Sequence, residues 1–466
     1  MNAKLSQFLR SRAEVRMRSP ISLPPITQEF NSLHDELFSF YTYQLPRKPA
    51  LQPRGGLSTP KKQLQLWREF QHSGADILPL TIDSNTRQND YKSATSLYNK
   101  ALTTGADTLN GYPILSIGLE KTKEIIHEIS MPISLRHGTP DARLLVETAF
   151  SAGIYEIEGG GISYLFPYSK SYPLDICLAN WRYVDRLCAF YNHNGAPVIR
   201  ESFAPLTSTL VHPVISSLVQ IIELVLAAKE GVMNFSVSIS QTGNLAQDIA
   251  TYNSLKGLVA WARSCFLEDD INIFYVYHQW MGAFPISRVK ADALLAYANF
   301  TAMLMGCDKT ILKTRDEALG IPSLTANAEA CIAAKYTRDR FSLSSVSITS
   351  SFIEEESEFC FREVQKLLQI VLHSPNVNIY ECISRAFRDG IIDIPFSPHI
   401  SNLGMHSCKR ALDGTIRVFT PGKIPFSDRF LKREKSLLET QVEPLNSSID
   451  SIVSMILHFA DPDDLQ

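Results

Sequence analysis

The sequence predicts an α/β fold: a TIM-type (β/α)8 barrel with an N-terminal arm and a smaller C-terminal α+β region. Short apolar or β-branched runs recur eight times between residues 77 and 314, and each is followed by a segment long enough for a helix. The fingerprint GxGxxG, which would favour an open doubly wound sheet, is missing. Strands that alternate with helices pair in parallel through right-handed crossovers, so eight such units favour closure into a barrel.

The expected strands are runs rich in Val, Ile, Leu, Phe and Tyr. In chain order they are 77–83, 112–118, 132–138, 154–160, 198–203, 234–240, 271–279 and 309–314. Segments between them, such as 211–231 and 244–266, carry the apolar spacing of helices. This reading assigns residues 51–345 to the barrel that carries the active site.

Two further segments flank the barrel. Residues 1–50 contain the Pro-rich run SPISLPPIT, which is typical of an arm that leads into a compact body. After residue 345 the pattern changes, because a long helical run is followed by VFTPGKIPFSD, which resembles a strand between Pro and Gly turns. We interpret residues 346–466 as a helical or α+β region packed on the barrel.

Composition and charge exclude several classes of protein. Of 466 residues, 45% are hydrophobic and 20% are charged, which is typical of a globular chain with a large core and excludes disorder as its main state. The formal net charge of −3 offers no general attraction for nucleic acid or an anionic membrane. The basic N-terminus lacks the apolar region of a signal peptide, and no apolar stretch of about 18 residues follows, so we expect a cytoplasmic protein.

The eight cysteines are scattered along the chain without a CxxC pair or a zinc-like spacing. This distribution predicts neither a disulfide framework nor a cysteine metal site. We therefore expect reduced core cysteines, and we assign no metal ligand to this chain.

Charged side chains gather where the expected strands end, which is the face that carries the active site in barrels of this kind. Arg54 lies just ahead of the first expected strand, and the strand ends carry Asp83 followed by Arg87, then Arg136, Glu158, His278, and Lys313 followed by Glu317. Three arginines suit a small substrate with two carboxylates, because guanidinium groups bind carboxylates in bidentate pairs. Taken singly, each arginine is more often a surface or ion-pair residue.

Glu158 opens the run EGGGISYLFPY. A glutamate at a strand end can accept hydrogen bonds from a substrate ammonium, and Gly160 and Gly161 allow the backbone to approach a bulky ligand closely. Tyr164 and Tyr168, four residues apart, can present their hydroxyls to the same loop, although paired tyrosines are more often plain packing.

Two further candidates each have a simpler interpretation beside the functional one. His278, within YHQWMGAFP, can donate to a ligand or be a satisfied core histidine. Lys313 and Glu317 stand four residues apart, and an ion pair is the ordinary relation between such neighbours.

Taken together and in order, several strings resemble the large (epsilon) subunit of glutamate mutase, also called methylaspartate mutase. These strings are DSNTRQN, RHGTPDAR, EGGGISYLFPY, QTGNLAQD, YHQWMGAFP, KTRDEALGIP and IDIPFSP. The resemblance extends over roughly residues 50–425. It implies a TIM barrel that caps adenosylcobalamin, and an isomerase that interconverts L-glutamate and threo-3-methylaspartate by radical carbon-skeleton rearrangement.

The resemblance also implies roles for individual residues. In the family, three arginines clamp the substrate carboxylates, and the matching residues are Arg54, Arg87 and Arg136. The expected catalytic residues are the glutamate that receives the substrate ammonium and two substrate-contacting tyrosines, matched by Glu158, Tyr164 and Tyr168. In the family, a lysine and a glutamate hold the adenosyl ribose, and the matching residues are Lys313 and Glu317. The other residues expected to contact the cofactor are His278, Gly160 and Gly161.

The cobalamin-binding motif DxHxxG, whose histidine ligates cobalt in this family, does not occur in the chain. The resemblance therefore implies a separate small cobalamin-binding subunit that carries this loop, in a heterotetramer with two of each chain. The chain departs from the family pattern at APLTSTL (204–210) and SQTGN (240–244), loops that we expect to face the corrin ring. It also has Gly55 where family members commonly have a cysteine.

Alternatives to a glutamate mutase stay open at this point. One is a mutase for a related acidic amino acid. Another, suggested by the altered loops, is a diverged, non-catalytic barrel that binds a dicarboxylate or a partner. An aldolase or lyase on the same scaffold has less support, because Lys313 is accompanied by Glu317 within a string that matches the mutase.

Overall fold

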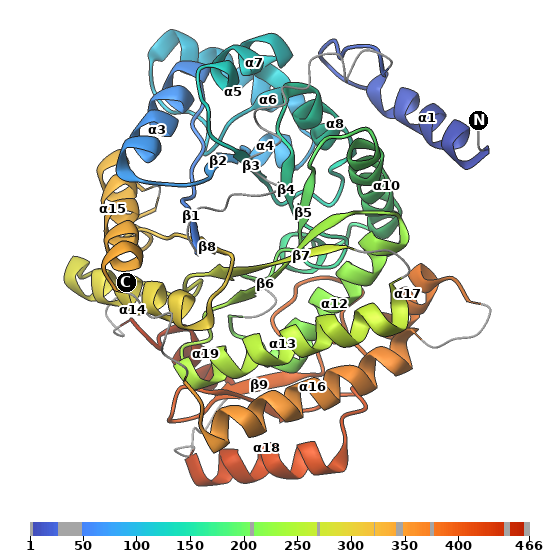
Figure 1. Cartoon of the computed structure of the whole chain (residues 1–466), viewed down its shortest axis with the longest axis vertical. Helices are drawn as coiled ribbons and strands as arrows, with labels where there is room; N and C mark the ends of the chain where they lie inside the picture. Colours follow the sequence, from blue (N-terminus) through green and yellow to red (C-terminus); the bar gives the residue numbers. More distant parts are fainter. Residues whose placement is uncertain are drawn as a thin grey trace.

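The computed structural model describes residues 3–26, 49–205, 209–267, 271–320, 322–341, 348–372, 377–441 and 448–460. Its centre is one sheet of eight parallel strands in the order β1-β8-β7-β6-β5-β4-β3-β2, surrounded by helices (Figure 1). The strands are β1 (Ala50–Gln52), β2 (Leu78–Thr81), β3 (Ile133–Arg136), β4 (Glu156–Glu158), β5 (Ile199–Glu201), β6 (Asn234–Ser240), β7 (Asn272–His278) and β8 (Lys309–Ile311). The predicted TIM-type barrel is confirmed.

The sheet closes at its first strand. β1 forms a parallel ladder with β8. On its other side, single backbone hydrogen bonds join it to the β2 region, from Ile77 N to Leu51 O at 3.2 Å and from Thr81 N to Gly55 O at 3.0 Å. Closure brings the carboxyl ends of all eight strands to one face of the barrel. We call this face, with the loops that follow the strands, the mouth.

The strand expected at 112–118 is wrong. Residues Ile114–Ile117 form the short helix α6, and Tyr112 makes only an isolated bridge to Ile82. Pro113 has no N–H to donate to a ladder, and a short buried apolar run does not by itself distinguish a strand from a helix. The first barrel strand is instead β1, which begins where the arm is expected to end, so Arg54 follows this strand rather than preceding the first one.

Capping side chains begin several of the helices that surround the barrel. Thr59, Asp90 and Asn244 each accept a hydrogen bond from an N–H in the first turn of the helix that follows. The described helices around the barrel, capped or not, are α3 (Pro60–Ser73), α4 (Ser84–Arg87), α5 (Tyr91–Thr104), α6 (Ile114–Ile117), α7 (Leu119–His127), α8 (Arg143–Ala152), α9 (Leu165–Tyr168), α10 (Leu174–His193), α12 (Pro213–Lys229), α13 (Leu245–Phe266), α14 (Arg288–Met305) and α15 (Leu324–Arg340).

The C-terminal part of the chain forms the smaller α+β region. Helix α16 lies along α12 and α13, and an antiparallel strand pair and α18 lie beyond it (Figure 1). Arg417 is buried between Glu356 of α16 and Glu434 of α18, and these ion pairs connect the elements of this region. Its elements are α16 (Ser351–Leu372), α17 (Ile379–Asp389), β9 (Ser407–Arg410), β10 (Ile416–Thr420), α18 (Asp428–Gln441) and α19 (Ser448–Ile456).

The described part of the N-terminal arm contains α1 (Ala3–Arg16), which lies at the edge of the barrel beside α8 (Figure 1). Arg12 donates to both carboxylate oxygens of Glu147 at 2.8 and 2.7 Å, and this buried bidentate pair orients α1. Residues 27–48 of the expected arm lie outside the described residues. Among the helices described, none is long and apolar enough to cross a membrane.

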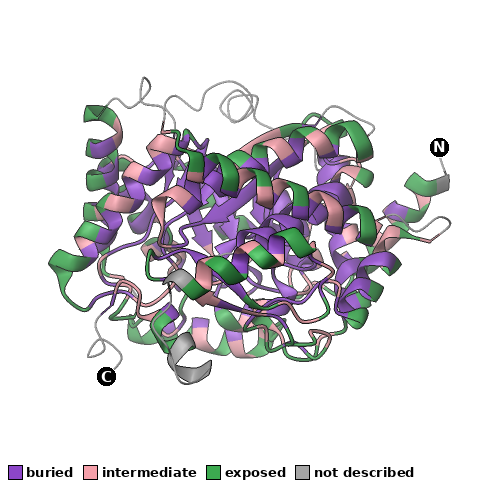
Figure 2. Cartoon of the chain, turned by 90° about the horizontal axis from the view of Figure 1, so that it is seen from below, coloured by how far each residue is buried: buried purple, intermediate pink, exposed green. Residues whose placement is uncertain are grey.

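The inside of the barrel is polar, whereas the layer between strands and helices is apolar. Buried residues are concentrated in the middle of the molecule (Figure 2). Successive side chains of a strand point to opposite faces, so Leu135 and Ile157 belong to the apolar core while Arg136, Glu156 and Glu158 point into the barrel. The candidate active site is built on this polar interior.

Candidate active site

Arg136 ends β3 and is only 6% exposed. Its guanidinium forms ion pairs with Glu158, at the end of β4, and with Glu201, at the end of β5, the latter at 3.2 Å. Glu158 and Glu201 are register partners in the β4–β5 ladder, so the parallel pairing itself brings the two carboxylates together. Burial opposes the charge on Arg136, but Glu158 and Glu201 raise its pKa above the ordinary value, and the guanidinium stays charged.

Glu158 has a second partner on the loop after its own strand. The Tyr164 hydroxyl donates to Oε1 of Glu158 at 2.5 Å. Burial raises the pKa of Glu158 to about 7, although Arg136 acts in the opposite direction. Burial and the neighbouring Glu158 raise the pKa of Tyr164 well above its ordinary value, so this hydroxyl remains a donor. Glu158 can therefore be ionised near neutral pH and accept a further hydrogen bond from a cationic ligand group.

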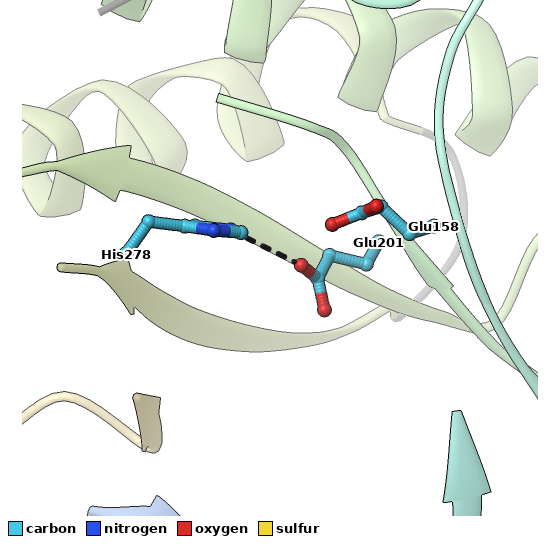
Figure 3. A group of neighbouring side chains, drawn as sticks. All are labelled: Glu158, Glu201 and His278. Atoms are coloured by element: carbon cyan, nitrogen blue, oxygen red, sulfur yellow. Dashed lines mark ion pairs between the residues drawn. The ribbon is translucent and has the colours of Figure 1, made fainter. Parts of the chain in front are cut away.

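Glu158, Glu201 and His278 point toward one another inside the barrel (Figure 3). His278 ends β7, and its Nε2 lies 3.3 Å from Oε1 of Glu201. Burial lowers the pKa of His278 to about 4, against the effect of the neighbouring Glu201, so the ring is neutral at physiological pH. The structure places His278 against Glu201, and its expected contact with the cofactor stays a prediction.

A second set of charges lies deeper in the barrel, and the sequence analysis missed it. Lys309, the first residue of β8, forms ion pairs with Glu156 of β4 and, at 2.5 Å, with Glu201. These three residues, which we call the deeper layer, are at most 5% exposed. Burial would raise the pKa of Glu201, but Lys309 and Arg136 hold it well below its ordinary value. Glu156 and Lys309 stand at strand beginnings, and Glu201 lies inside the expected strand 198–203, so none of the three occupies an expected strand end.

Gln52 is a further residue that the sequence analysis missed. It ends β1 and is fully buried, and its neighbour Leu51 belongs to the apolar core, so Gln52 points into the barrel. Its amide nitrogen and oxygen have no hydrogen-bond partner among the described residues. A buried amide with free donor and acceptor capacity is suited to a polar ligand group.

The carboxylates and imidazole of Glu158, Glu201 and His278 offer ligand atoms within 4.8 Å of one another, which is close enough for a metal ion. However, Arg136 and Lys309 already pair with these carboxylates. A divalent cation would have to displace or lie beside two positive groups, which is electrostatically unfavourable. The chain's own cations therefore already neutralise part of this cluster, which disfavours a metal ion there.

The three arginines singled out from the sequence lie at the mouth around Tyr168. Burial and then Glu158 raise the pKa of Tyr168, while the positive charges of Arg54, Arg87 and Arg136 lower it, so all three guanidinium groups act electrostatically on this hydroxyl. Arg54 is 43% exposed, and its Nη1 lies 3.9 Å from Glu317. Arg87 follows β2 and is held by a hydrogen bond from Nε to the carbonyl of Ile82 at 2.5 Å.

Lys313 and Glu317 meet at the same mouth. Lys313 Nζ donates to Glu317 Oε2 at 2.5 Å, and its backbone N–H donates to the Gln279 side chain at 2.7 Å. Burial and then Arg54 lower the pKa of Lys313 to about 8, against the effect of Glu317. A cationic donor beside a carboxylate acceptor matches two neighbouring hydroxyl groups, because each hydroxyl both donates and accepts.

Gly160 and Gly161 are buried against the protein's own side chains. A Cβ at Gly160 would overlap the carboxylate of Glu223, and one at Gly161 would lie 3.0 Å from Leu178. These contacts give a reason for both glycines without a ligand. Their expected contact with a cofactor stays a prediction.

Of the two loops that depart from the family pattern, the 204–210 loop lines an apolar cavity and the 240–244 loop contacts the C-terminal segment. A cavity of about 300 Å³ lies at the mouth and is lined by residues that include Pro167, Pro205, Met281, Phe396 and Ile456. In the 240–244 loop, Gly243 accepts a hydrogen bond from His458, which follows α19. Residues 206–208 of the other loop lie outside the described residues.

Comparison with known proteins agrees with this arrangement. Residues 40–451 match the family model of the methylaspartate mutase E chain. The chain belongs to this family. Among its relatives are the glutamate mutase epsilon subunits of Treponema denticola, 36% identical over 87% of this chain and 83% of the relative, and of Desulfitobacterium hafniense, 36% identical over 91% and 89%. The epsilon subunit of Yersinia enterocolitica is 37% identical over 80% of this chain and 77% of the relative.

Distant solved structures are also similar to this member of the methylaspartate mutase E-chain family. One is a dihydropteroate synthase from Xanthomonas albilineans, with 11% identity and a TM-score of 0.35 over 64% of this chain and 96% of that chain. A likeness at this level adds nothing to the architecture described above.

Proposed function

We propose that this chain is the catalytic subunit of an adenosylcobalamin-dependent glutamate mutase (methylaspartate mutase), an isomerase that interconverts L-glutamate and threo-3-methylaspartate. Membership of the family supports a role as a glutamate mutase component. The observation that carries the specific reaction is the gathering of Arg54, Arg87 and Arg136 around Tyr168, with Glu158 beside Arg136.

The charges of L-glutamate match those of the mouth. At neutral pH the substrate carries two carboxylates and one ammonium. The arginines offer bidentate partners for the carboxylates, and charge-assisted hydrogen bonds of this kind contribute about 1.5–3 kcal/mol each. Glu158 offers a carboxylate for the ammonium, and its hydrogen bond with Tyr164 fixes one of its two oxygens.

The residues of the mouth fit adenosylcobalamin in two respects. The Lys313–Glu317 pair can bind the two ribose hydroxyls of the adenosyl group, with the donor and the acceptor that a diol requires. The apolar cavity next to the mouth suits the edge of a corrin ring. When bound, the cofactor supplies a carbon-centred radical through homolysis of its cobalt–carbon bond.

The chain's own residues would then bind the substrate, orient it and shield it from solvent. The arginines fix both carboxylates, and Glu158 and Tyr164 orient the ammonium, so the substrate presents one carbon in a constant position. Tyr168 lies against Gly138 and over the mouth, where its ring can separate the substrate from solvent. The buried, paired side chains of Glu156, Glu201 and Lys309 fill the barrel beneath the mouth, and this packing would help to shield a reactive intermediate from solvent.

We also propose a partner: a small cobalamin-binding subunit with a DxHxxG loop, which ligates the cobalt, in a cytoplasmic heterotetramer with two copies of each chain. The epsilon-subunit names of the relatives support a partner subunit. Exposed apolar side chains near the mouth, among them Phe396, Ile400 and Leu412, are suited to burial against such a partner.

The test is reconstitution. The chain is combined with a DxHxxG subunit and adenosylcobalamin, and formation of 3-methylaspartate from L-glutamate is measured, with omission of the cofactor as the control. We expect product only in the complete mixture. Absence of product with several such subunits would reject the mutase and favour a non-catalytic dicarboxylate-binding barrel. Faster conversion of another acidic amino acid would favour a related mutase.

A further inference from the structure

Glu223 is a buried carboxylate behind the loop that follows β4, outside the candidate active site. It lies on α12 and is 2% exposed. Its Oε1 accepts the backbone N–H groups of Ile162 at 3.0 Å and Ser163 at 2.9 Å. Its Oε2 accepts the hydroxyls of Ser163 at 3.1 Å and Ser202 at 2.6 Å. A carboxylate with four donors has no capacity left for a ligand, so its partners are the loop itself and the end of β5.

A buried arginine holds the beginning of the same loop. Arg200 Nη1 donates to the carbonyl of Gly159, and Nη2 lies 3.8 Å from Glu223. Its Nε donates to Asp185 at 3.1 Å, and its guanidinium lies 4.5 Å from the centre of the Trp181 ring. Arg200 and Glu223 therefore hold both the carbonyl and the amide groups of the loop, from the side of helices α10 and α12.

The glycines of the loop allow this contact. A Cβ at Gly160 would overlap the Glu223 carboxylate. Gly159 has φ +139°, which disfavours other residues, and a Cβ there would lie 2.6 Å from the Tyr164 ring. The run of glycines thus lets the backbone pass between Glu223 on one side and Tyr164 on the other.

We propose that Glu223 is a positioning residue for recognition of the substrate ammonium. Tyr164 directly follows Ser163, its N–H bonds to the Gly160 carbonyl at 3.2 Å, and its hydroxyl holds Glu158. The position of the Ile162–Ser163 backbone therefore determines where Tyr164 and Glu158 can meet an ammonium group. This inference rests on the proposed function, which makes that ammonium part of the substrate.

The arginines are held by other parts of the chain. Arg54 follows β1 and Arg87 follows β2, and Arg136, although it pairs with Glu158, is also held by β3 and by its ion pair with Glu201. The hydrogen bonds and ion pairs that Glu223 makes with described residues go to the β4 loop, Ser202 and Arg200. Loss of Glu223 should therefore weaken binding of the ammonium and leave binding of the two carboxylates almost unchanged. Glutarate, which has both carboxylates and no ammonium, separates the two effects.

The experiment compares Glu223→Leu, which has similar volume and no acceptor, with Glu223→Gln, which keeps an oxygen for the two amides. Hydrogen exchange of the 159–164 backbone is measured in the full chain. The KM for L-glutamate and the Ki for glutarate are measured in the complex with the cobalamin-binding subunit. For Glu223→Leu we expect the hydrogen-exchange rate of the loop and the KM for L-glutamate to rise about tenfold, while the Ki for glutarate stays within about twofold of the unmodified value. For Glu223→Gln all three quantities should stay within about threefold of the unmodified values.

Ser202→Ala is the second variant, because it removes one hydroxyl donor to Glu223 and is expected to fold. It should shift loop exchange and KM in the same direction, by about threefold. Ser254→Ala is the matched control, since Ser254 is an equally buried serine on α13, and it should leave all three quantities unchanged.

Three outcomes would overturn the positioning role: unchanged loop exchange in Glu223→Leu and Ser202→Ala, faster exchange with unchanged KM, or equal increases in KM and in the Ki of glutarate. If Glu223→Leu does not fold, Ser202→Ala decides by the same criteria. Failure of the proposed function is distinguishable, because the unmodified complex would then form no methylaspartate while hydrogen exchange would still report whether Glu223 holds the loop.

Discussion

The barrel contains two layers of charge that differ in how their charges are matched. In the deeper layer, Lys309 lies between Glu156 and Glu201, all three are buried, and each has an ion-pair partner. At the mouth, the cationic side chains of Arg54, Arg87, Arg136 and Lys313 stand against the carboxylates of Glu158 and Glu317.

This difference indicates that the charges of the deeper layer stabilise the fold, whereas those of the mouth are available to bind a ligand. A buried charge that lacks a partner is costly, so each carboxylate of the deeper layer pairs with Lys309, and Glu201 also pairs with Arg136. At the mouth, Arg54 remains 43% exposed and keeps its hydration until an anion arrives. The excess of positive charge there favours an anionic ligand.

The largest expected effect is loss of the cation in the deeper layer. Lys309→Met leaves two buried carboxylates without their ammonium, which should lower the free energy of unfolding by about 3–5 kcal/mol. Arg54→Met is the matched control at the mouth and should change it by less than about 1 kcal/mol. Urea unfolding of the full chain measures both. Equal stability of the two variants would contradict the division into layers.

The next largest effect concerns Arg136, which pairs with Glu201 of the deeper layer and is proposed to bind a substrate carboxylate. Arg136→Lys replaces a planar fork by a point charge, and we expect the KM for L-glutamate in the reconstituted complex to rise about 100-fold. Arg68→Lys, at an exposed ion pair with Glu128, is the control and should leave KM unchanged. Unchanged kinetics in Arg136→Lys would reject the assignment of Arg136 as a carboxylate ligand.

The smallest effect is on pH dependence. The pKa of Glu158 is raised to about 7, so its carboxylate is available to an ammonium only above that pH, and kcat/KM for L-glutamate should rise up to tenfold per pH unit below it. The pKa of Lys313 is lowered to about 8, so its charge is lost above that pH and kcat/KM should then fall. Glu158→Gln should remove the rise of kcat/KM with pH, and Lys313→Arg should remove its fall at higher pH. If neither variant alters the pH profile of kcat/KM, these two residues are not its origin.

Part of the candidate site could be predicted because residues at strand ends share one face of a barrel. That rule was enough to single out Arg87, Arg136, Glu158 and Lys313. It could not reveal Glu223, which lies in the third turn of an apolar helix, because its partners are backbone groups of a distant loop. Nor could it show that Gly160 faces this carboxylate rather than a ligand.

The hydrophobic pattern of the chain was enough to predict an alternation of strands and helices, and hence a closed parallel barrel, because hydrophobic periodicity is a local property. It did not decide whether the run 112–118 is a strand or a helix, since both bury the same apolar residues. The pairing of the charges became visible in the folded barrel alone. Ion pairs such as that of Lys309 with Glu156 depend on strand register and on the distance between side chains, and neither can be read along the chain.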